Sequence, residues 1–353
     1  MNKLQIYSCG AFNESYINNL TLFTTGFGRL SLCCGLLFLA VLPFLCCPYV
    51  LFLLNTAGIY AMAAVGLNLL TGHTGQLSLG QGACFGIGAY TAAILVSKLE
   101  LSFFLAIPAA GTLAVLFAIV FCIPATRLRF IYLAFITLAG QLIFDYLIKW
   151  MPLTGGQEGI VINESGLFGL DLNDDRIVYY IVFLCLIGFT WMAVNVTRTS
   201  YGRAFSALRI NPRATEALGI SVVKFRMLSI AISSFYTGLA GGLFTLHMLA
   251  ITPELFNLWL SIEFIAMIII GGLGSISGSI MGACFIVVLN EFLVFVTDIA
   301  TKNDLLVDSA MTKLALREFS IGIIIVLFIL FQPKGLHGIW RNIILYFRRW
   351  PFS

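Results

Sequence analysis

Charged side chains are scarce in this sequence. Lysine and arginine number 20 and aspartate and glutamate 16 among 353 residues, so that 10% of the chain is charged while 60% is hydrophobic. A soluble globular domain has about 25% charged and about 45–50% apolar residues. Because so few charges cannot cover the surface of a water-soluble fold of this size, we expect the chain to use lipid as its solvent. The usual estimate of about 150 residues per domain then does not apply.

Residue patterns for several kinds of chemistry are also missing. The three histidines, His73, His247 and His337, lie far apart and no HExxH sequence occurs, so we expect neither a metal site nor catalytic residues. No GxxxxGK[ST] loop occurs, and we expect no ATP or other cofactor to be bound by this chain itself. The nine cysteines form no CxxC, which disfavours a disulfide framework. A net charge of +4, spread along the chain, disfavours nucleic-acid binding.

Long apolar runs, by contrast, are plentiful. A transmembrane helix needs about 20 mainly apolar residues, and two shorter apolar stretches, 56–71 and 258–271, each stop at a glycine cluster. We predict an all-α polytopic membrane bundle of about ten spans, or eight without these two. The first long run contains Pro43 and Pro48, which a membrane helix can tolerate. The long runs are 30–54, 82–98, 103–123, 130–149, 177–197, 226–250, 278–297 and 314–331.

The few charges predict an orientation, because loops rich in lysine and arginine stay in the cytoplasm. Basic residues dominate 198–226, the tail 332–353 and the connection 124–129, whereas acids dominate 150–176 and 298–313. Ten spans with both termini in the cytoplasm place every basic segment inside and both acidic loops outside. Eight spans also satisfy the charges if each short stretch forms a re-entrant hairpin with the helix that follows it. We prefer ten, because eight would leave two long helices without a crossing.

Three regions follow from this threading. Residues 1–28 are polar and lack the apolar core of a cleavable signal peptide. Residues 29–331 form the predicted transmembrane domain, and residues 332–353 form a basic cytoplasmic tail.

Two glycine-rich segments, 72–82 and 271–278, interrupt apolar sequence and predict two glycine-broken helices. A broken helix exposes backbone groups, which is tolerable at membrane depth only against protein or a water-filled cavity, and paired breaks point to a substrate path in transporters. Alternatively, the glycines only allow helices to pack closely. Both interpretations stay open. The residues we expect to border a path are Gly72, Gly75, Gln76, Ser78, Gly274 and Ser277.

Four acids fall within the predicted spans: Asp145, Glu263, Glu291 and Glu318. Ionisable groups at membrane depth are functional candidates. All four lie toward the predicted outer ends of their helices, where carboxylates can reach water, which favours a structural role over a proton relay. An ion-coupled transporter is therefore the less favoured alternative, and a membrane enzyme lacks any clustered catalytic constellation.

The basic segment 198–226 contains a predicted short helix. Pro212 suits a first turn, Asn211 suits its N-cap, and Gly219 suits its end. Such an amphipathic helix fits docking on a cytoplasmic partner, and it also fits lying on anionic lipid, which needs only positive charge. The compact capped unit favours a partner.

Several glycine-anchored motifs recur in order along the chain and resemble those of branched-chain amino-acid ABC importer permeases, in particular the type with Gly-Gln-Leu-Ser. The resemblance extends from about residue 30 to residue 340. The motifs are Gly66-Leu67-Asn68-Leu69-Leu70-Thr71-Gly72, Gly75-Gln76-Leu77-Ser78-Leu79-Gly80, Gly86-Ile87-Gly88-Ala89-Tyr90, Leu153-Thr154-Gly155-Gly156, Ser200-Tyr201-Gly202-Arg203-Ala204, Glu216-Ala217-Leu218-Gly219, Gly238-Leu239-Ala240-Gly241-Gly242, Gly271-Gly272-Leu273-Gly274-Ser275 and Pro333-Lys334-Gly335-Leu336.

The resemblance implies a bacterial inner-membrane importer in which this chain pairs with a homologous permease, as a hetero- or homodimer. Two ATPase subunits would use ATP, and a periplasmic binding protein would deliver the substrate. Gln81 and Gln157-Glu158 depart from residues common in the family, so the substrate is a branched-chain or other small amino acid, urea or a short amide. The residues implied in coupling to the ATPase are Arg203, Arg209, Arg213, Glu216, Ala217 and Gly219.

Overall fold

Helices account for nearly all of the computed structural model, which describes residues 26–123, 130–162, 166–167, 170–171, 174–302 and 310–349. Most of the predicted polar segment 1–28 lies outside these ranges. The longer helices are α2 (Gly26–Leu45), α3 (Pro48–Asn68), α4 (Gln81–Leu99), α5 (Phe103–Cys122), α6 (Phe130–Trp150), α7 (Asp175–Arg198), α8 (Ser200–Ile210), α10 (Val222–Met248), α11 (Leu258–Gly271), α12 (Ile276–Lys302), α13 (Ala310–Phe331) and α14 (Gly335–Arg349). The short elements are η1 (Leu69–His73), η3 (Pro152–Thr154), β1 (Ile160–Val161), β2 (Gly166–Leu167), β3 (Leu170–Asp171), α9 (Pro212–Ala217), β4 (Ala250–Ile251) and η4 (Pro253–Phe256).

The helices confirm an all-α polytopic membrane protein. Within the described ranges, seven helices are long and apolar enough to cross a membrane, and α13 with α14 makes an eighth if that pair, bent by 45°, counts as one span. Two shorter apolar helices, Cys34–Leu45 and Leu258–Gly271, account for the remaining predicted segments. Each of the ten predicted segments thus coincides with helix, while the number that crosses the bilayer stays a prediction.

The predicted boundary between the first two segments is wrong. Residues 30–54 do not form one helix, because α2 ends at Leu45 and α3 begins at Pro48, with Cys47 extended between them at φ −68° and ψ 155°. Proline disfavours the helical conformation of the residue before it and suits the first turn of a new helix. The stretch 56–71 is therefore part of one long helical span, Pro48–His73, rather than a short segment of its own.

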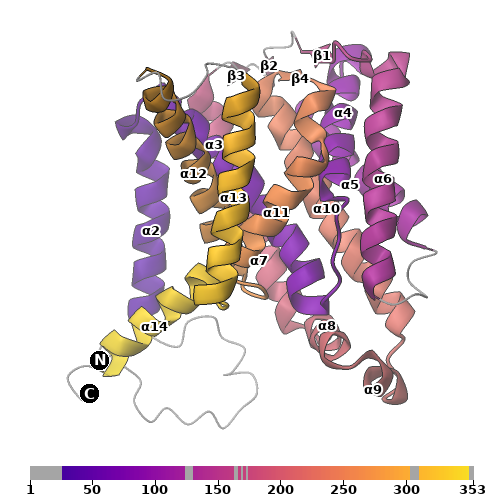
Figure 1. Ribbon diagram of the computed structural model, residues 1–353, viewed down its shortest axis with the longest axis vertical. Helices are drawn as coiled ribbons and strands as arrows, with labels where there is room; N and C mark the ends of the chain where they lie inside the picture. The colour runs from indigo at the N-terminus through magenta and orange to yellow at the C-terminus, as the bar shows by residue number, and fades with distance from the viewer. Residues whose placement is uncertain are drawn as a thin grey trace.

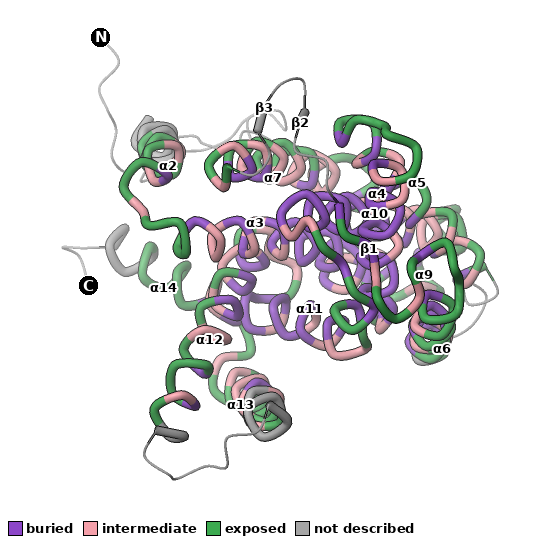
Figure 2. The backbone as a smooth tube through the Cα atoms, turned by 90° about the horizontal axis from the view of Figure 1, so that it is seen from above, coloured by how far each residue is buried: buried purple, intermediate pink, exposed green. Residues whose placement is uncertain are grey.

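Four helices, α3, α4, α10 and α11, form the buried centre of the bundle, and the other long helices surround them (Figure 2). The helix α3 runs antiparallel to α10, since Thr56 near its start lies 3.2 Å from His247 near the end of α10. The helix α4 runs parallel to α10, since Gln81 bonds to Ser233 and the carbonyl of Ala89 accepts from Thr245, both at 3.0 Å. Consequently α3 and α4 run antiparallel to each other, and each packs against α10.

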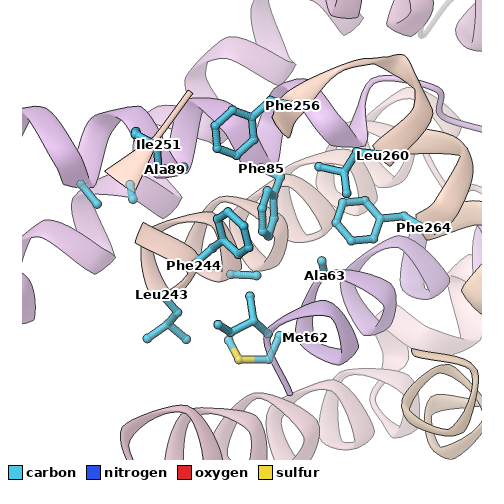
Figure 3. Close-up of a cluster of buried hydrophobic side chains, with 14 of the residues drawn as sticks. Met62, Ala63, Phe85, Ala89, Leu243, Phe244, Ile251, Phe256, Leu260 and Phe264 are labelled. Atoms are coloured by element: carbon cyan, nitrogen blue, oxygen red, sulfur yellow. The ribbon is translucent and has the colours of Figure 1, made fainter. Parts of the chain in front are cut away.

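Aromatic side chains fill the middle of this centre (Figure 3). The ring of Phe85 on α4 lies 5.3 Å from that of Phe244, 5.4 Å from that of Phe264 and 6.0 Å from that of Phe256. These are the tilted contacts that aromatic rings prefer over face-to-face stacking. One aromatic cluster therefore joins α4, α10, α11 and η4.

Basic and acidic segments lie at opposite ends of the bundle (Figure 1). The helices α8, α9 and α14 occupy one end. The end of α6, the start of α7 and the end of α12 occupy the other, together with a two-stranded pairing of Ile160 with Ile251. The ten-span threading predicts this separation, and so does the eight-span alternative with re-entrant hairpins. The basic connection 124–129 lies outside the described residues.

Candidate functional site

Each glycine-rich segment joins a central helix to the helix that follows it in the chain. After α3, the chain continues as the π-helical turn η1, and Gly75, at φ +75°, then ends the helical path. The chain runs without helix inside the bundle from there to Gly80, and α4 begins at Gln81 (Figure 1). The second segment separates α11 from α12, and Gly272 lies at φ +121° there. Both segments leave backbone groups to be paired by side chains.

The two segments meet at one place, which we call the glycine junction and define by Asn68, Gly72, Gly274, Ser275 and Ser279. The Asn68 amide nitrogen donates to the Ser275 carbonyl at 2.8 Å and to the Ser279 hydroxyl at 2.7 Å. The side-chain oxygen of Asn68 accepts a hydrogen bond from the Gly274 backbone N–H at 2.8 Å. A single buried side chain on α3 thus fixes the second segment through three hydrogen bonds.

Contact at the glycine junction is too close for larger residues. A Cβ added at Gly72 would lie 1.9 Å from the Asn68 side-chain oxygen and 2.5 Å from the Gly274 nitrogen. Real Cβ contacts are not this short, so the backbones could not approach if residue 72 were alanine. At Gly72 and Gly274 the geometry therefore supports the packing interpretation of the glycines.

Arg209 connects the exposed loop helices to both glycine segments. Its guanidinium, at the end of α8, donates to the Gly72 carbonyl. The same guanidinium lies 3.3 Å from the position of a Cβ at Gly274, and the Arg209 side chain lies 3.2 Å from that of a Cβ at Gly75. Movement of α8 would therefore displace the Arg209 side chain and change its contacts with both glycine segments.

Above the junction, the first segment is bound to α10 by a row of buried polar groups that we call the polar seam: Gln76, Gln81, Ser229, Ser233 and Thr237. Gln76 donates to Ser229 and Gln81 donates to Ser233, each at 3.0 Å, while Thr237 donates to Gln81 at 2.8 Å. All five residues are buried, and all are neutral. The seam satisfies polar groups between helices without placing charge there.

The start of α4 is held by a second helix pair. The Gly82 N–H donates to Ser261 of α11 at 2.8 Å, and the Ala83 N–H donates to Gln141 of α6 at 2.5 Å. Gln141 also donates to the Phe256 carbonyl at 2.7 Å. The first N–H groups of a helix have no partner within the helix, so these side chains satisfy them inside the bundle. Sequence reasoning missed both Gln141 and Asn68, and isolated amides in apolar runs were the available signal.

The structure separates the six predicted path residues. Gly72 and Gly274 meet at the glycine junction, Gly75 is exposed beside Arg209, and Gln76 belongs to the polar seam. Ser78 lines a small cavity between α4, α5, α6 and α10, together with Gln81, Thr137 and Ser234. Ser277 is exposed and lies 3.1 Å from His337 of α14.

The six predicted coupling residues are all exposed on α8, on α9 and just after it. The predicted N-cap is confirmed, since the Asn211 side chain accepts from the backbone N–H of Arg213 at 3.1 Å and of Ala214 at 3.2 Å. Gly219 follows the helix at φ +82°. Two large apolar side chains flank α9 at high exposure, Ile210 at 85% and Leu218 at 80%. This end of the bundle presents a capped helix with uncovered apolar and basic groups.

The structure gives the surroundings of the four acids within the helices, while their role stays a prediction. Asp145 accepts from Gln141 at 3.0 Å, Glu291 accepts from Tyr49, and Glu318 is partly exposed. Glu263, however, is only 3% exposed, so the expectation that all four acids reach water is wrong at this residue. The cause is its position on α11, a central helix covered by its neighbours. The Asn290 amide lies 3.5 Å from its carboxylate.

No group of three or more histidine, cysteine or acidic side chains that could hold a metal ion occurs among the described residues. The glycine junction and the polar seam consist of amides, hydroxyls and backbone groups. Such groups can donate hydrogen bonds to a polar solute and accept hydrogen bonds from it.

The described residues form a multi-pass helical bundle with buried polar groups between its helices, and the comparisons with known proteins identify its class as a transport permease. Residues 49–330 match the family described as branched-chain amino acid transport system / permease component, and the chain belongs to this family.

Individual relatives support the same family. The chain is 32% identical over 260 residues to the high-affinity branched-chain amino acid transport system permease protein LivM of Escherichia coli (strain K12). This match covers 67% of the chain and 61% of that relative. It is 23% identical over 322 residues to the probable branched-chain amino acid transport permease protein LivM of Methanocaldococcus jannaschii, which covers 79% of this chain and 90% of that relative. No solved structure matches the chain.

Proposed function

We propose that this chain is the permease subunit of an ATP-binding-cassette importer in a bacterial inner membrane, with its termini and the α8–α9 end in the cytoplasm. It pairs with a homologous permease, as a hetero- or homodimer, and two separate ATPase subunits dock below. A periplasmic binding protein delivers the substrate from the opposite side. The family and the names of the relatives support this assignment, and so does the location of the basic segments at one end (Figure 1).

The observation on which the proposal rests is the contact of Arg209 with the glycine junction. The helix α9 and one face of α8 are exposed to a partner, and Arg209 bonds this unit to the Gly72 carbonyl. The hydrogen bonds of Asn68 then connect this first segment to the second. A partner that pulls on α9 would therefore act on both glycine segments of the central bundle.

A protein partner explains α9 better than a lipid surface does. A lipid surface requires only positive charge and one apolar face. Here the exposed apolar residues, Ile210 and Leu218, stand at the two ends of a six-residue capped helix, with Glu216 between them. A rigid capped unit with both signs of charge suits a shaped protein cleft.

The proposed mechanism is alternating access. ATP closes the ATPase pair and draws the two docking loops together, so that the permease pair opens outward to receive substrate. ATP hydrolysis resets the pair and releases substrate inward. A ligand shifts such an equilibrium only by binding one state more tightly, so ATP and the binding protein must each prefer one state. This chain itself binds no ATP in the proposal.

The proposed substrate is a branched-chain or another small amino acid, with urea and short amides as related candidates. A small zwitterionic or neutral solute suits the polar seam, whose groups are neutral. The residues Ser78 and Gln81 line the small cavity beside the seam, and we place the substrate path along that side of the first glycine segment. The less favoured function is ion-coupled secondary transport, for which the buried Glu263 is the best candidate residue.

The test is Arg209→Gln, with Lys224→Gln as the matched removal of an exposed positive charge elsewhere in the same loop. A hydrogen bond from a charged group contributes about 1.5–3 kcal/mol, so its loss should slow uptake by about tenfold or more. The ATPase subunits should still copurify with Arg209→Gln, because α9 is unchanged. Lys224→Gln should transport like the wild type. Undiminished uptake by Arg209→Gln would contradict the proposed link.

A further inference from the structure

Helix α14 has an apolar stripe that the bundle does not cover. Ile339, Trp340, Ile343 and Ile344 are 40%, 53%, 43% and 47% exposed. Their spacing places them on one face, because residues three and four apart are neighbours on a helix. The four side chains therefore form a continuous apolar surface that requires a cover.

The first turn of α14 is fixed against the second glycine segment. A Cβ at Gly335 would lie 2.6 Å from the Gly272 nitrogen, so the two backbones touch. The His337 ring nitrogen Nδ1 lies 3.1 Å from the Ser277 hydroxyl. The direction in which α14 leaves the bundle is thus set by contacts with a central element, at the end that also bears α8 and α9 (Figure 1).

The apolar stripe begins inside the bundle. Leu336 precedes Trp340 by four residues and Ile343 by seven, so it lies on the same face, and it packs against the main hydrophobic core. Farther along, α14 extends away from the central helices (Figure 2). The apolar face of α14 thus packs on the core in the first turn and is uncovered farther along the helix. That part of α14 lies beside the bundle, where lipid surrounds a membrane protein.

The positive charge of residues 332–353 and the length of α13 indicate what covers the apolar stripe of α14. The segment 332–353 contains four basic residues and no acid, and Arg341 and Asn342 are exposed next to the apolar stripe. The 22 residues of α13 extend about 33 Å, close to the thickness of a hydrocarbon layer of about 30 Å. The helix α14 is bent by 45° from α13, so it does not continue along the axis of that helix.

We propose that α14 is an interfacial helix that lies on the bilayer at the α8–α9 end, with Ile339, Trp340, Ile343 and Ile344 in the acyl boundary and Arg341 on anionic headgroups. Amphipathic helices with lysine or arginine on one face and large apolar residues on the other bind in this way. Tryptophan is also enriched at this depth. The proposal goes beyond the transport function and does not depend on it.

The experiment places the photoreactive residue p-benzoyl-phenylalanine at position 343 or, as the matched control, at position 342 of the full chain. The chain is held in nanodiscs made of phosphatidylcholine and phosphatidylglycerol in equal amounts. After illumination, mass spectrometry identifies the adduct. We expect phospholipid adducts at 343 and several-fold fewer at 342. Equal yields at both positions, a protein adduct at 343 or no adduct would overturn the interfacial placement.

The lipid headgroup found in the adduct tests whether the basic residues of α14 favour anionic lipid. Each basic residue near an anionic surface contributes about 1 kcal/mol, or up to about fivefold in local enrichment. Phosphatidylglycerol should therefore be enriched in the adducts at 343, and Arg341→Gln with Arg348→Gln and Arg349→Gln should return it to its share in the bilayer. An unenriched wild type, or enrichment that survives the triple change, would overturn the anionic preference. Unchanged elution and continued lipid adducts in the triple variant show that it is folded.

Discussion

Replacing Asn68 by alanine should destabilise the chain more than the same change at Asn55. Both asparagines lie on α3 and both are 0% exposed, so the loss of packing is closely matched. Asn68 makes three hydrogen bonds of 2.7–2.8 Å, whereas Asn55 makes one of 3.3 Å to the Asp175 carbonyl. The Asn55 side-chain oxygen has no hydrogen-bond partner among the described residues. The comparison therefore isolates the hydrogen bonds of the glycine junction.

The expected difference follows from the number of bonds. Hydrogen bonds between membrane helices average about 0.6 kcal/mol and reach about 1.7 kcal/mol, so two additional good bonds correspond to about 1–3 kcal/mol. The value should not be larger, because Ser275 and Ser279 remain bonded to each other at 3.3 Å after the change. In Asn68→Ala the Gly274 N–H is left without the acceptor that Asn68 provides. The cost of this unpaired donor accounts for the upper part of the expected range of free energies.

The assay is unfolding in mixed detergent micelles by titration with sodium dodecyl sulfate, followed by circular dichroism. The free energies of unfolding of Asn68→Ala and Asn55→Ala are each compared with that of the wild type. An Asn55→Ala variant that is destabilised as much as Asn68→Ala would refute the reasoning, because buried volume rather than the junction would then account for the cost.

Three further predictions concern transport. Glu216→Arg or Gly219→Trp should weaken copurification of the ATPase subunits while membrane insertion is retained, and undiminished ATPase binding would rule out α9 as the docking helix. Gly75→Val should block uptake without preventing assembly, since Gly75 lies at φ +75° with Arg209 beside it; normal uptake would leave that glycine a packing role. Collapse of the proton gradient with ATP maintained should leave uptake largely intact, and loss of uptake would support ion coupling through acids such as Glu263.

Local features of the fold were predictable from the sequence because their causes are local. Apolar runs predicted where helices lie, and Asn211 with Pro212 predicted the start of α9, since a cap needs only neighbouring residues. The break at Cys47 was not predicted, because a proline in an apolar run has two possible outcomes. Proline is compatible both with a tolerated kink, as at Pro43 inside α2, and with a new helix, as at Pro48. Only the packing of the surrounding helices decides between these outcomes.

The candidate site was less predictable because its contacts join distant parts of the chain. The sequence showed two glycine segments but not that Gly72 lies against Gly274, and it showed a basic loop but not that Arg209 bonds to the first segment. Asn68 and Gln141 are single amides in apolar runs, a pattern that predicts a polar partner without naming it. Such pairings depend on helix order and direction, which one sequence does not specify.

The polar seam has a consequence for biosynthesis. Residues 75–80 run through the bundle without helical hydrogen bonds of their own, and Gln76 and Gln81 depend on Ser229 and Ser233 of α10. The ribosome completes α3 and α4 roughly 150 residues before these partners exist, while lipid offers no substitute for them. The bonds that hold the first glycine segment to α10 can therefore form only late in synthesis, after α10 has joined the earlier helices.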